Sequence, residues 1–417
     1  MFRSRGQLQA VRCLVARQSH ILYVAPTGQG KTIVPLMAMK LWPSHIRMVI
    51  ILPYVLLYQE MHERFQKAGI TVGHWSLGST SLNARVITVG VESARHPSFV
   101  NFVERIADMG NLGALVMDEA HGLVEDPSWR ADYSLLSRLT TINTVFLLLT
   151  ATAPPAFTPR LWETLNIKYN TPHTCVEIRE STVRPNLTYQ LVPPIPSEFN
   201  HHHSLLSVLV HMRDLLTGPD RGVVFVYSPS TATKLANDLK CGFVTGPLTP
   251  TARHEAMERW KNGTDPCDRL IIMTKAGFYG WDYPNIRFSV HVDAPLSITE
   301  WAQATGRVGR DGGRSLCVVF TGHPADAGLV DEDWAGHQGV TRLMSGDECV
   351  RHVSTGHLDG RAQDCPALSQ ETPSLRICSY CHALAPTPIT LWGNPLPVND
   401  WYITQPRVSV WSLDSSP

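Results

Sequence analysis

The residues of this sequence that are best suited to chemistry begin with a glycine-rich run near its start. The run extends from Ala25 to Thr32 and lies between a short apolar segment and a stretch compatible with a helix. Small residues let backbone amides close around phosphate groups, and a helix N-terminus adds partial positive charge. The alternative is an ordinary glycine-rich turn after a strand, but the strand-then-helix context favours a phosphate loop. The residues expected to bind the nucleotide here are Thr27, Gly28, Gly30, Lys31 and Thr32.

Within this loop, Lys31 would reach the terminal phosphate oxygens and the Thr32 hydroxyl would join the shell of a Mg²⁺ ion. A second polar run, Asp118-Glu119-Ala120-His121, follows another apolar segment. Phosphoryl transfer to water needs a carboxylate that holds the metal and a group that activates the water. Asp118 suits the first role and Glu119 the second. Acidic turns end many strands, so it is the combination with the loop that predicts a nucleotide hydrolase.

Two arginines in the second half of the chain supply positive charge for such a site. The run from Gln303 to Arg310 places Arg307 and Arg310 on one helix face or turn. Arginines that reach a γ-phosphate from another domain stabilise the transition-state charge and couple hydrolysis to domain closure. The alternative interpretation is two surface arginines near a turn.

Cysteines cluster after about residue 330, as Cys349, Cys365 and the pair Cys378-x-x-Cys381. Thiolates bind Zn²⁺ tetrahedrally, and a gap of two residues lets one turn present two sulfur atoms. The pair is a specific signal by itself, whereas Cys349 and Cys365 need further support. Three histidines are alternatives for one of the four ligands: His352, His357 and His382.

Alternating apolar runs and helix-compatible stretches predict the elements that position these residues, namely parallel strands joined by crossover helices. Proline-rich sequence between Thr171 and Asn200 suits a connection between two α/β halves. The predicted domains are residues 1–180, 181–335 and 336–385, followed by an irregular tail over 386–417. The predicted strands are Ile21–Ala25, Met48–Leu52, Val86–Val89, Leu115–Met117, Thr144–Leu149, Gly222–Val226, Leu270–Met273, Phe288–Val292 and Leu316–Phe320.

The composition of the 417 residues excludes several classes of protein. Lys plus Arg and Asp plus Glu both number 36, so a nucleic-acid partner would need a local groove rather than bulk attraction. No apolar run is long enough to span a membrane, and no signal sequence is recognisable. An intracellular protein with reduced thiols is expected, located in the nucleus if its source is eukaryotic.

The order of these motifs resembles that of superfamily-two helicases, and the details are similar to the RecQ family. The resemblance extends over about residues 2 to 381. It implies two RecA-like motor domains followed by a small helical zinc module that holds Zn²⁺ through all four cysteines. The segments that carry it include Phe2–Val11, Leu149–Ala153, Arg184–Tyr189, Phe225–Ser228, Pro284–Pro295 and Gly309–Gly312. The roles implied are contacts to the nucleotide for Gln7, His121 and Gln303, and coupling or nucleic-acid contacts for Thr150, Thr152, Trp129, Arg130 and Asp282.

The activity implied by this resemblance is ATP-dependent movement along single-stranded DNA in the 3′-to-5′ direction with unwinding of duplex DNA, in repair and recombination. ATP, Mg²⁺ and Zn²⁺ are the expected cofactors, and single-stranded and partially duplex DNA the expected partners. Two departures affect the segments that couple DNA to hydrolysis: the loop at Gly122–Tyr133 lacks an earlier Gln-Trp, and Lys275–Asp282 has an unusual glycine arrangement. The alternatives are a nucleic-acid platform with weak or no unwinding and an RNA-directed superfamily-two helicase. We also expect a reduced family member or an incomplete gene product, because no further DNA-binding domain is recognisable after Cys381.

Overall fold

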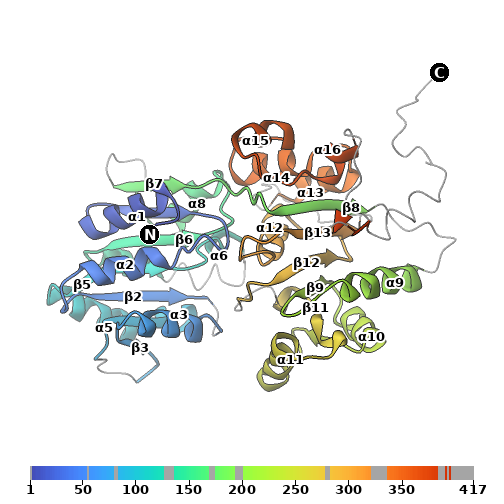
Figure 1. Ribbon diagram of the computed structural model, residues 1–417. Helices are drawn as coiled ribbons and strands as arrows, with labels where there is room; N and C mark the ends of the chain where they lie inside the picture. The colour runs from blue at the N-terminus through green and yellow to red at the C-terminus, as the bar shows by residue number, and fades with distance from the viewer. Residues whose placement is uncertain are drawn as a thin grey trace.

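The computed structural model consists of two α/β lobes side by side, with a group of short helices packed against the second lobe (Figure 1). The residues described are 2–53, 56–78, 83–125, 136–168, 174–192, 201–277, 282–320, 336–383, 390–391 and 394–395.

The first lobe is built on a parallel sheet whose described strands follow the order β3-β4-β2-β5-β6-β1-β7. Strands β2, β5 and β6 are almost entirely buried, as expected for continuous apolar runs that are covered on both faces. The bounds are β1 (His20–Val24), β2 (Arg47–Leu52), β3 (Val72–His74), β4 (Val86–Gly90), β5 (Leu112–Met117), β6 (Val145–Thr150) and β7 (Cys175–Arg179).

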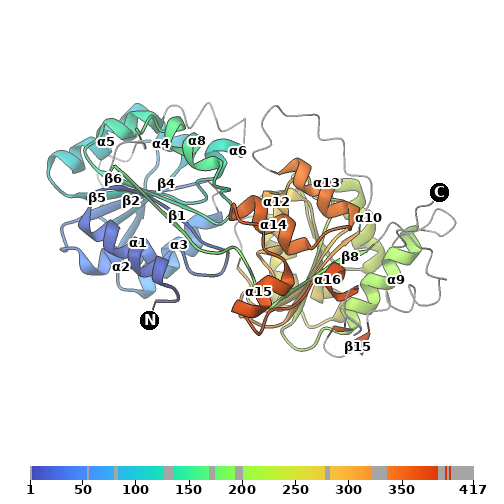
Figure 2. The ribbon, with the colours of Figure 1, turned by 90° about the horizontal axis from the view of Figure 1, so that it is seen from above.

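Helices cover both faces of this sheet (Figure 2). Side chains alternate along β1, so that Tyr23 joins the apolar cluster that contains Phe65, whereas Leu22 joins the cluster that contains Phe99 and Trp162. The helices are α1 (Arg5–Ala16), α2 (Ile33–Leu41), α3 (Leu56–Lys67), α4 (Val91–Ala94), α5 (Pro97–Asp108), α6 (Gly122–Glu125), the 3₁₀ helix η1 (Ser137–Thr141) and α8 (Phe157–Thr164).

The second lobe repeats this architecture with a parallel sheet in the order β10-β11-β9-β12-β13-β8. Its strands are β8 (Leu187–Val192), β9 (Arg221–Phe225), β10 (Gly242–Val244), β11 (Leu270–Met273), β12 (Ile286–His291) and β13 (Ser315–Phe320). Its helices are α9 (His201–Asp214), α10 (Pro229–Leu239), α11 (Pro250–Asn262), η2 (Pro266–Arg269), η3 (Lys275–Gly277) and α12 (Ile298–Thr305). Two parallel-sheet lobes of α/β class confirm the predicted fold class.

The remaining helices form a module on the outer side of β8 (Figure 1). They are α13 (His337–Ser345), α14 (Val350–Leu358), α15 (Cys365–Glu371) and α16 (Ser379–Ala383). Their buried residues, Val353 and Leu368 among them, belong to the same apolar cluster as Leu187 and Trp301 of the second lobe. The module therefore shares a core with that lobe.

The connection between the two lobes lies within the predicted segment from Thr171 to Asn200, but it is shorter than that segment because β7 and β8 both lie in it. Both are edge strands, and β8 has two partly buried positions, Thr188 and Leu191, among buried ones, so neither shows the continuous apolar run of a central strand. The seven residues from Glu180 to Asn186 that join them form the actual interlobe linker.

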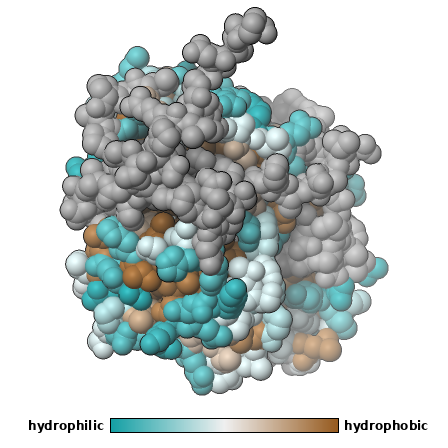
Figure 3. Space-filling model, turned by 90° about the vertical axis from the view of Figure 1, so that its right-hand side faces the viewer, coloured by the Kyte–Doolittle hydropathy of each residue, from teal (hydrophilic) through white to brown (hydrophobic). Residues whose placement is uncertain are grey.

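The predicted irregular tail over residues 386–417 lies mostly outside the described residues. Within it, β14 (Thr390–Leu391) pairs antiparallel with β15 (Asn394–Pro395). No described helix is both long and apolar enough to cross a lipid bilayer. On the described part of the face in Figure 3, hydrophobic side chains occur in small groups among hydrophilic ones.

Candidate functional site

The glycine-rich loop lies between β1 and α2, at the carboxyl edge of the first sheet. Gly28 and Gly30 have φ values of 80° and 83°, a region that residues with side chains rarely adopt. The Lys31 ammonium donates a hydrogen bond to the Ala25 carbonyl at 3.1 Å, which holds the side chain across the loop. Thr32 comes directly before α2. The sequence therefore folds locally into the strand–loop–helix arrangement that a phosphate site requires.

Gln7 of α1 lies beside this loop and is fully buried. Its Nε2 donates to the Gly30 carbonyl at 3.0 Å and to the Gln29 carbonyl at 3.3 Å, and its Oε1 accepts from the Arg3 amide at 2.9 Å. The side chain thus fixes the backbone of the loop from behind. Its contact to adenine stays a prediction.

The acidic residues Asp118 and Glu119 follow β5 directly. Glu119 has a φ of 51°, which is left-handed and uncommon for a residue with a side chain. One oxygen of its carboxylate is 3.4 Å from the His121 ring nitrogen Nδ1. Burial by itself raises the pKa of Glu119, but His121, Lys31, Arg307 and Arg310 together outweigh burial, and the pKa lies below its ordinary value. Glu119 is therefore an ionised carboxylate at neutral pH.

Arg307 and Arg310 enter the same region from the turn that follows α12 in the second lobe. Both line a cleft of about 500 Å³ together with residues of the first lobe. A Cβ atom on Gly28 would lie 3.4 Å from Cγ of Arg310, so this arginine packs directly over the phosphate loop. The predicted site residues that line the cleft are Thr27, Gly28, Gly30, Lys31, Thr32, Asp118, Glu119, Asp282, Arg307 and Arg310.

The charges in the cleft partly compensate one another. Burial lowers the pKa of Lys31, and the carboxylates of Glu119 and Asp118 oppose that effect. Arg307 and Arg310 act in the same direction as burial, because further positive charge disfavours the ammonium. The cleft is lined by five cationic side chains and four carboxylates, so its small excess of positive charge is suited to an anionic ligand.

A polar network joins the two lobes beside the cleft. The Gln303 amide nitrogen lies 2.6 Å from the His121 ring nitrogen Nε2 and donates to the Thr152 hydroxyl at 3.1 Å. The other ring nitrogen of His121 is 3.1 Å from the Thr150 hydroxyl. All four residues are buried. The structure thus brings together the predicted nucleotide contacts His121 and Gln303 and the predicted coupling residues Thr150 and Thr152.

An ion-pair chain crosses the mouth of the cleft. The Asp282 carboxylate of the second lobe accepts from Arg310 at 2.8 Å and from Arg64 of α3 in the first lobe at 3.3 Å. Arg64 also donates to the Thr32 hydroxyl at 3.2 Å, the group predicted to join the Mg²⁺ shell. Burial raises the pKa of Asp282, but Arg310, together with Arg64 and Arg307, more than offsets this and holds the pKa below its ordinary value.

Sequence reasoning missed three arginines at this site. Arg64 and Arg3 line the cleft, and Arg3 donates to the Gly28 carbonyl. Arg184 of the interlobe linker donates to the Val308 carbonyl at 2.9 Å and the Gly309 carbonyl at 2.8 Å. These bonds fix the turn that carries Arg307 and Arg310. Arg3 and Arg184 each lie in a segment that carries the family resemblance, Phe2–Val11 and Arg184–Tyr189, whereas Arg64 lies in none of them. The predicted nucleic-acid contacts Trp129 and Arg130 lie outside the described residues.

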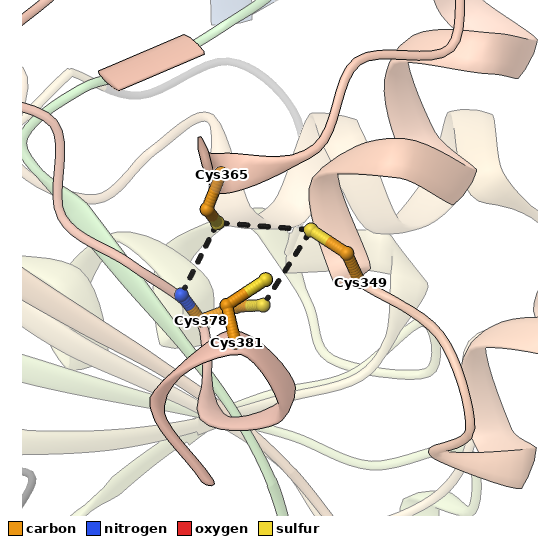
Figure 4. Close-up of side chains that lie close together, drawn as sticks. All are labelled: Cys349, Cys365, Cys378 and Cys381. Carbon is orange, nitrogen blue, oxygen red and sulfur yellow. Dashed lines mark hydrogen bonds between the residues drawn. The ribbon is translucent and has the colours of Figure 1, made fainter. Parts of the chain in front are cut away.

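The cysteine cluster lies in the helical module, away from the cleft. Cys349 comes directly before α14, Cys365 begins α15, and Cys378 and Cys381 lie at α16 (Figure 4). The four sulfur atoms all lie within 4.8 Å of one another. The three histidines weighed as alternatives are not part of this group, which is the only such candidate among the described residues.

The geometry of the sulfur atoms fits a tetrahedral metal. Cys349 is 3.7 Å from Cys365 and 3.7 Å from Cys378, measured between sulfur atoms. A tetrahedron with Zn–S bonds of about 2.3 Å has edges of about 3.8 Å. A disulfide would need sulfur atoms about 2 Å apart, so the cysteines are free thiols in metal-binding geometry.

Two family models match the chain: the DEAD/DEAH box helicase model over residues 4–158 and the helicase conserved C-terminal domain model over residues 205–312. The ATP-dependent DNA helicase RecQ of Bacillus subtilis is 26% identical over 342 residues, which cover 76% of this chain and 54% of the relative. The ATP-dependent DNA helicase Q-like 4B of Arabidopsis thaliana is 26% identical over 385 residues, covering 87% of this chain and 31% of that protein. The DUF1998 helicase MrfA bound to DNA superposes with a TM-score of 0.60 at 16% identity, over 88% of this chain and 58% of that one, which indicates a shared fold.

The paired lobes, the cleft between them and the two family models define a superfamily-two helicase. Within that class the chain is similar to RecQ and RecQ-like DNA helicases, which confirms the resemblance predicted from the sequence motifs. It spans about half the length of the Bacillus relative and about a third of the Arabidopsis relative.

Proposed function

We propose that this chain hydrolyses ATP in the interlobe cleft and uses the energy to move along single-stranded DNA in the 3′-to-5′ direction, separating duplex DNA. The observation that carries the proposal is the cleft itself. Lys31 and Glu119 of the first lobe line it opposite Arg307 and Arg310 of the second. The names of the relatives, which are DNA helicases, support DNA as the track.

Each of these residues has a definable task in hydrolysis. The loop amides and Lys31 hold the phosphates, and a bound Mg²⁺ would draw charge from them and order their oxygens. The Thr32 hydroxyl and the Asp118 carboxylate are hard oxygen ligands that line the same cleft and would hold this ion. Glu119, ionised at neutral pH, accepts the proton of the attacking water. Arg307 and Arg310 stabilise the negative charge that develops as the bond to the leaving phosphate breaks.

The buried network of Gln303, His121 and Thr152 would couple hydrolysis to movement. It joins His121, which lies two residues after Glu119, to the loop after β6 and to α12 of the other lobe. A change in the angle between the lobes must therefore rearrange hydrogen bonds beside Glu119. This linkage gives one lobe the means to step relative to the other with each turnover.

We propose further that the four clustered cysteines bind one structural Zn²⁺. All four positions are taken by protein sulfur atoms, as in structural sites, whereas catalytic zinc keeps one position open.

The proposal is tested with duplexes that carry a single-stranded tail at the 3′ or the 5′ end of one strand. ATP-dependent strand separation of the 3′-tailed DNA alone is the expected result, with no separation when a non-hydrolysable analogue replaces ATP. Binding without separation would favour the platform, and stimulation of hydrolysis by RNA but not DNA would favour the RNA-directed motor. Either result would refute the proposed activity.

A further inference from the structure

Helix α14 connects the cysteine cluster with the interlobe linker. The residue that caps its start is Cys349, one of the four clustered cysteines, and the residue that caps its end is Asp359. The Thr182 amide of the linker donates to both carboxylate oxygens of Asp359 at 3.1 Å, and the Ser181 hydroxyl lies 3.3 Å from one of them. One short helix thus has the sulfur cluster at one end and the linker at the other.

The same helix also holds the strand into which the linker leads. Arg351 is 2% exposed, and its guanidinium donates to the Leu187 carbonyl of β8 at 2.7 Å and to the Arg376 carbonyl at 2.7 Å. The guanidinium also lies 4.8 Å from the centre of the Tyr189 ring in β8. Arg376 in turn donates its amide to the linker carbonyl of Pro185 at 2.8 Å. The module therefore forms hydrogen bonds with the linker near both of its ends.

The turn after α14 reaches the first lobe as well. Gly360 has a φ of 70°, and a Cβ atom there would lie 2.9 Å from Cγ of Pro155. Pro155 follows closely on Thr152, which accepts the interlobe hydrogen bond from Gln303. A module that shares its core with the second lobe thus meets the first lobe beside the network that couples the two.

We infer that α14 is a strut between the cysteine centre and the hinge of the motor, and that Asp359 is the positioning residue that clamps the linker. A small cavity of about 40 Å³ lies where the linker, both lobes and α14 meet, lined by Thr182, Trp301 and Ser354 among others. Because this junction is not fully packed, the lobes can change their angle without opening either core. The clamp, rather than core packing, then limits the range of that angle.

The experiment measures the distance between the lobes in the full chain. Fluorophores are attached through non-natural amino acids at exposed Met109 and Lys234, one in each lobe, because nine native cysteines preclude thiol labelling. Without nucleotide, Asp359→Ala should broaden the distribution of interlobe distances. Asp359→Asn keeps an acceptor for the Thr182 amide and should resemble the native protein. Asp347→Ala, at an exposed carboxylate of the same module, is the matched control.

A second arm adds a non-hydrolysable ATP analogue and depends on the proposed function, which the first arm does not. Asp359→Ala should weaken binding of the analogue on the order of tenfold, the effect of losing hydrogen bonds to a charged group. Zinc content by elemental analysis should stay unchanged. Failure of the native protein to bind the analogue would refute the proposed function, while the nucleotide-free distances would still test the clamp.

An unchanged width of the nucleotide-free distribution in Asp359→Ala would overturn the inference. Should that variant fold poorly, Gly360→Ala perturbs the neighbouring contact between the turn after α14 and the first lobe, since an added Cβ must displace Pro155. It is expected to broaden the distribution of interlobe distances, and native-like distances in a folded Gly360→Ala protein would overturn the inferred role of α14 in setting the angle between the lobes.

Discussion

Glu119 occupies a strained backbone position, and its neighbours show what that position achieves. A left-handed conformation costs a residue with a side chain about 1–3 kcal/mol. In return the next residue, Ala120, donates its amide to the Leu149 carbonyl of β6 at 2.9 Å, and His121 reaches Thr150 at the end of the same strand. The strain therefore turns the Glu119 carboxylate toward the cleft and the His121 ring toward the interlobe network.

Replacing the lysine of the phosphate loop gives the first prediction. Lys31→Ala should abolish ATP hydrolysis, because the phosphates lose the cation that neutralises them. Release of phosphate is the measurement, and Lys40→Ala at the exposed end of α2 is the control. Normal turnover in Lys31→Ala would remove the assignment of the loop.

The arginine over the loop gives the second prediction. Arg310→Ala should lower kcat by at least about a hundredfold and change KM for ATP much less, because the guanidinium acts on charge that develops in the transition state. Steady-state kinetics separate the two constants. Arg314→Ala, at an exposed arginine of the same turn, should be near native. A large rise in KM with unchanged kcat would instead assign Arg310 to ground-state binding.

Site residues could be predicted from the sequence when they lie in a short local motif, and not when they meet only in the folded chain. Lys31 and Asp118 were predictable because each belongs to a short motif that follows a strand, and local spacing carries that information. Arg64 was not, because it lies on a helix without any such motif and meets Asp282 only when the two lobes come together. Contacts between distant segments depend on the assembled fold, which spacing does not specify.

At the scale of elements, the central strands were predicted to within a few residues and the edge strands were missed. Strands such as β2 and β6 are covered on both faces, so they are continuous apolar runs in the sequence. β3 and β10 have three residues each, and β7 is only partly buried, so none leaves such a run. The module was located by its cysteines and not by its helices, which are short and share a core with the neighbouring lobe.

The cysteine module gives the third prediction. Cys378→Ser should lower the zinc content from stoichiometric to near zero and reduce the soluble yield, because three thiolates hold the ion more weakly than four. Elemental analysis of the purified protein measures the metal. Cys267→Ser, at a cysteine outside the cluster, should keep its zinc. Unchanged metal content in Cys378→Ser would contradict the zinc assignment.

At the scale of the whole molecule, stability should depend on pH through a buried histidine. His291 ends β12 and packs on Phe225, and burial lowers its pKa to about 3. Above pH 6.5 the ring is neutral in both the folded and the unfolded chain. Below that pH only the unfolded chain takes up the proton, so the free energy of unfolding falls as the pH drops from about 6.5 toward 3.

The fourth prediction follows from this linkage. Native protein should lose up to about 2 kcal/mol more stability between pH 7.5 and pH 5 than His291→Gln, in which the titrating group is absent. Urea unfolding monitored at both pH values measures the difference. An equal loss of stability in the two proteins would show that His291 is protonated in the folded state.

The seven-residue linker joins the edge strand of one sheet to the edge strand of the other. Fully extended, it spans at most about 25 Å, so even with every interlobe contact broken the two halves stay within that tether. Re-engagement of the halves is then an intramolecular event at a millimolar effective concentration, independent of how dilute the protein is. Two lobes joined in this way can release their nucleotide completely after each cycle and still return to the closed arrangement, because they never separate.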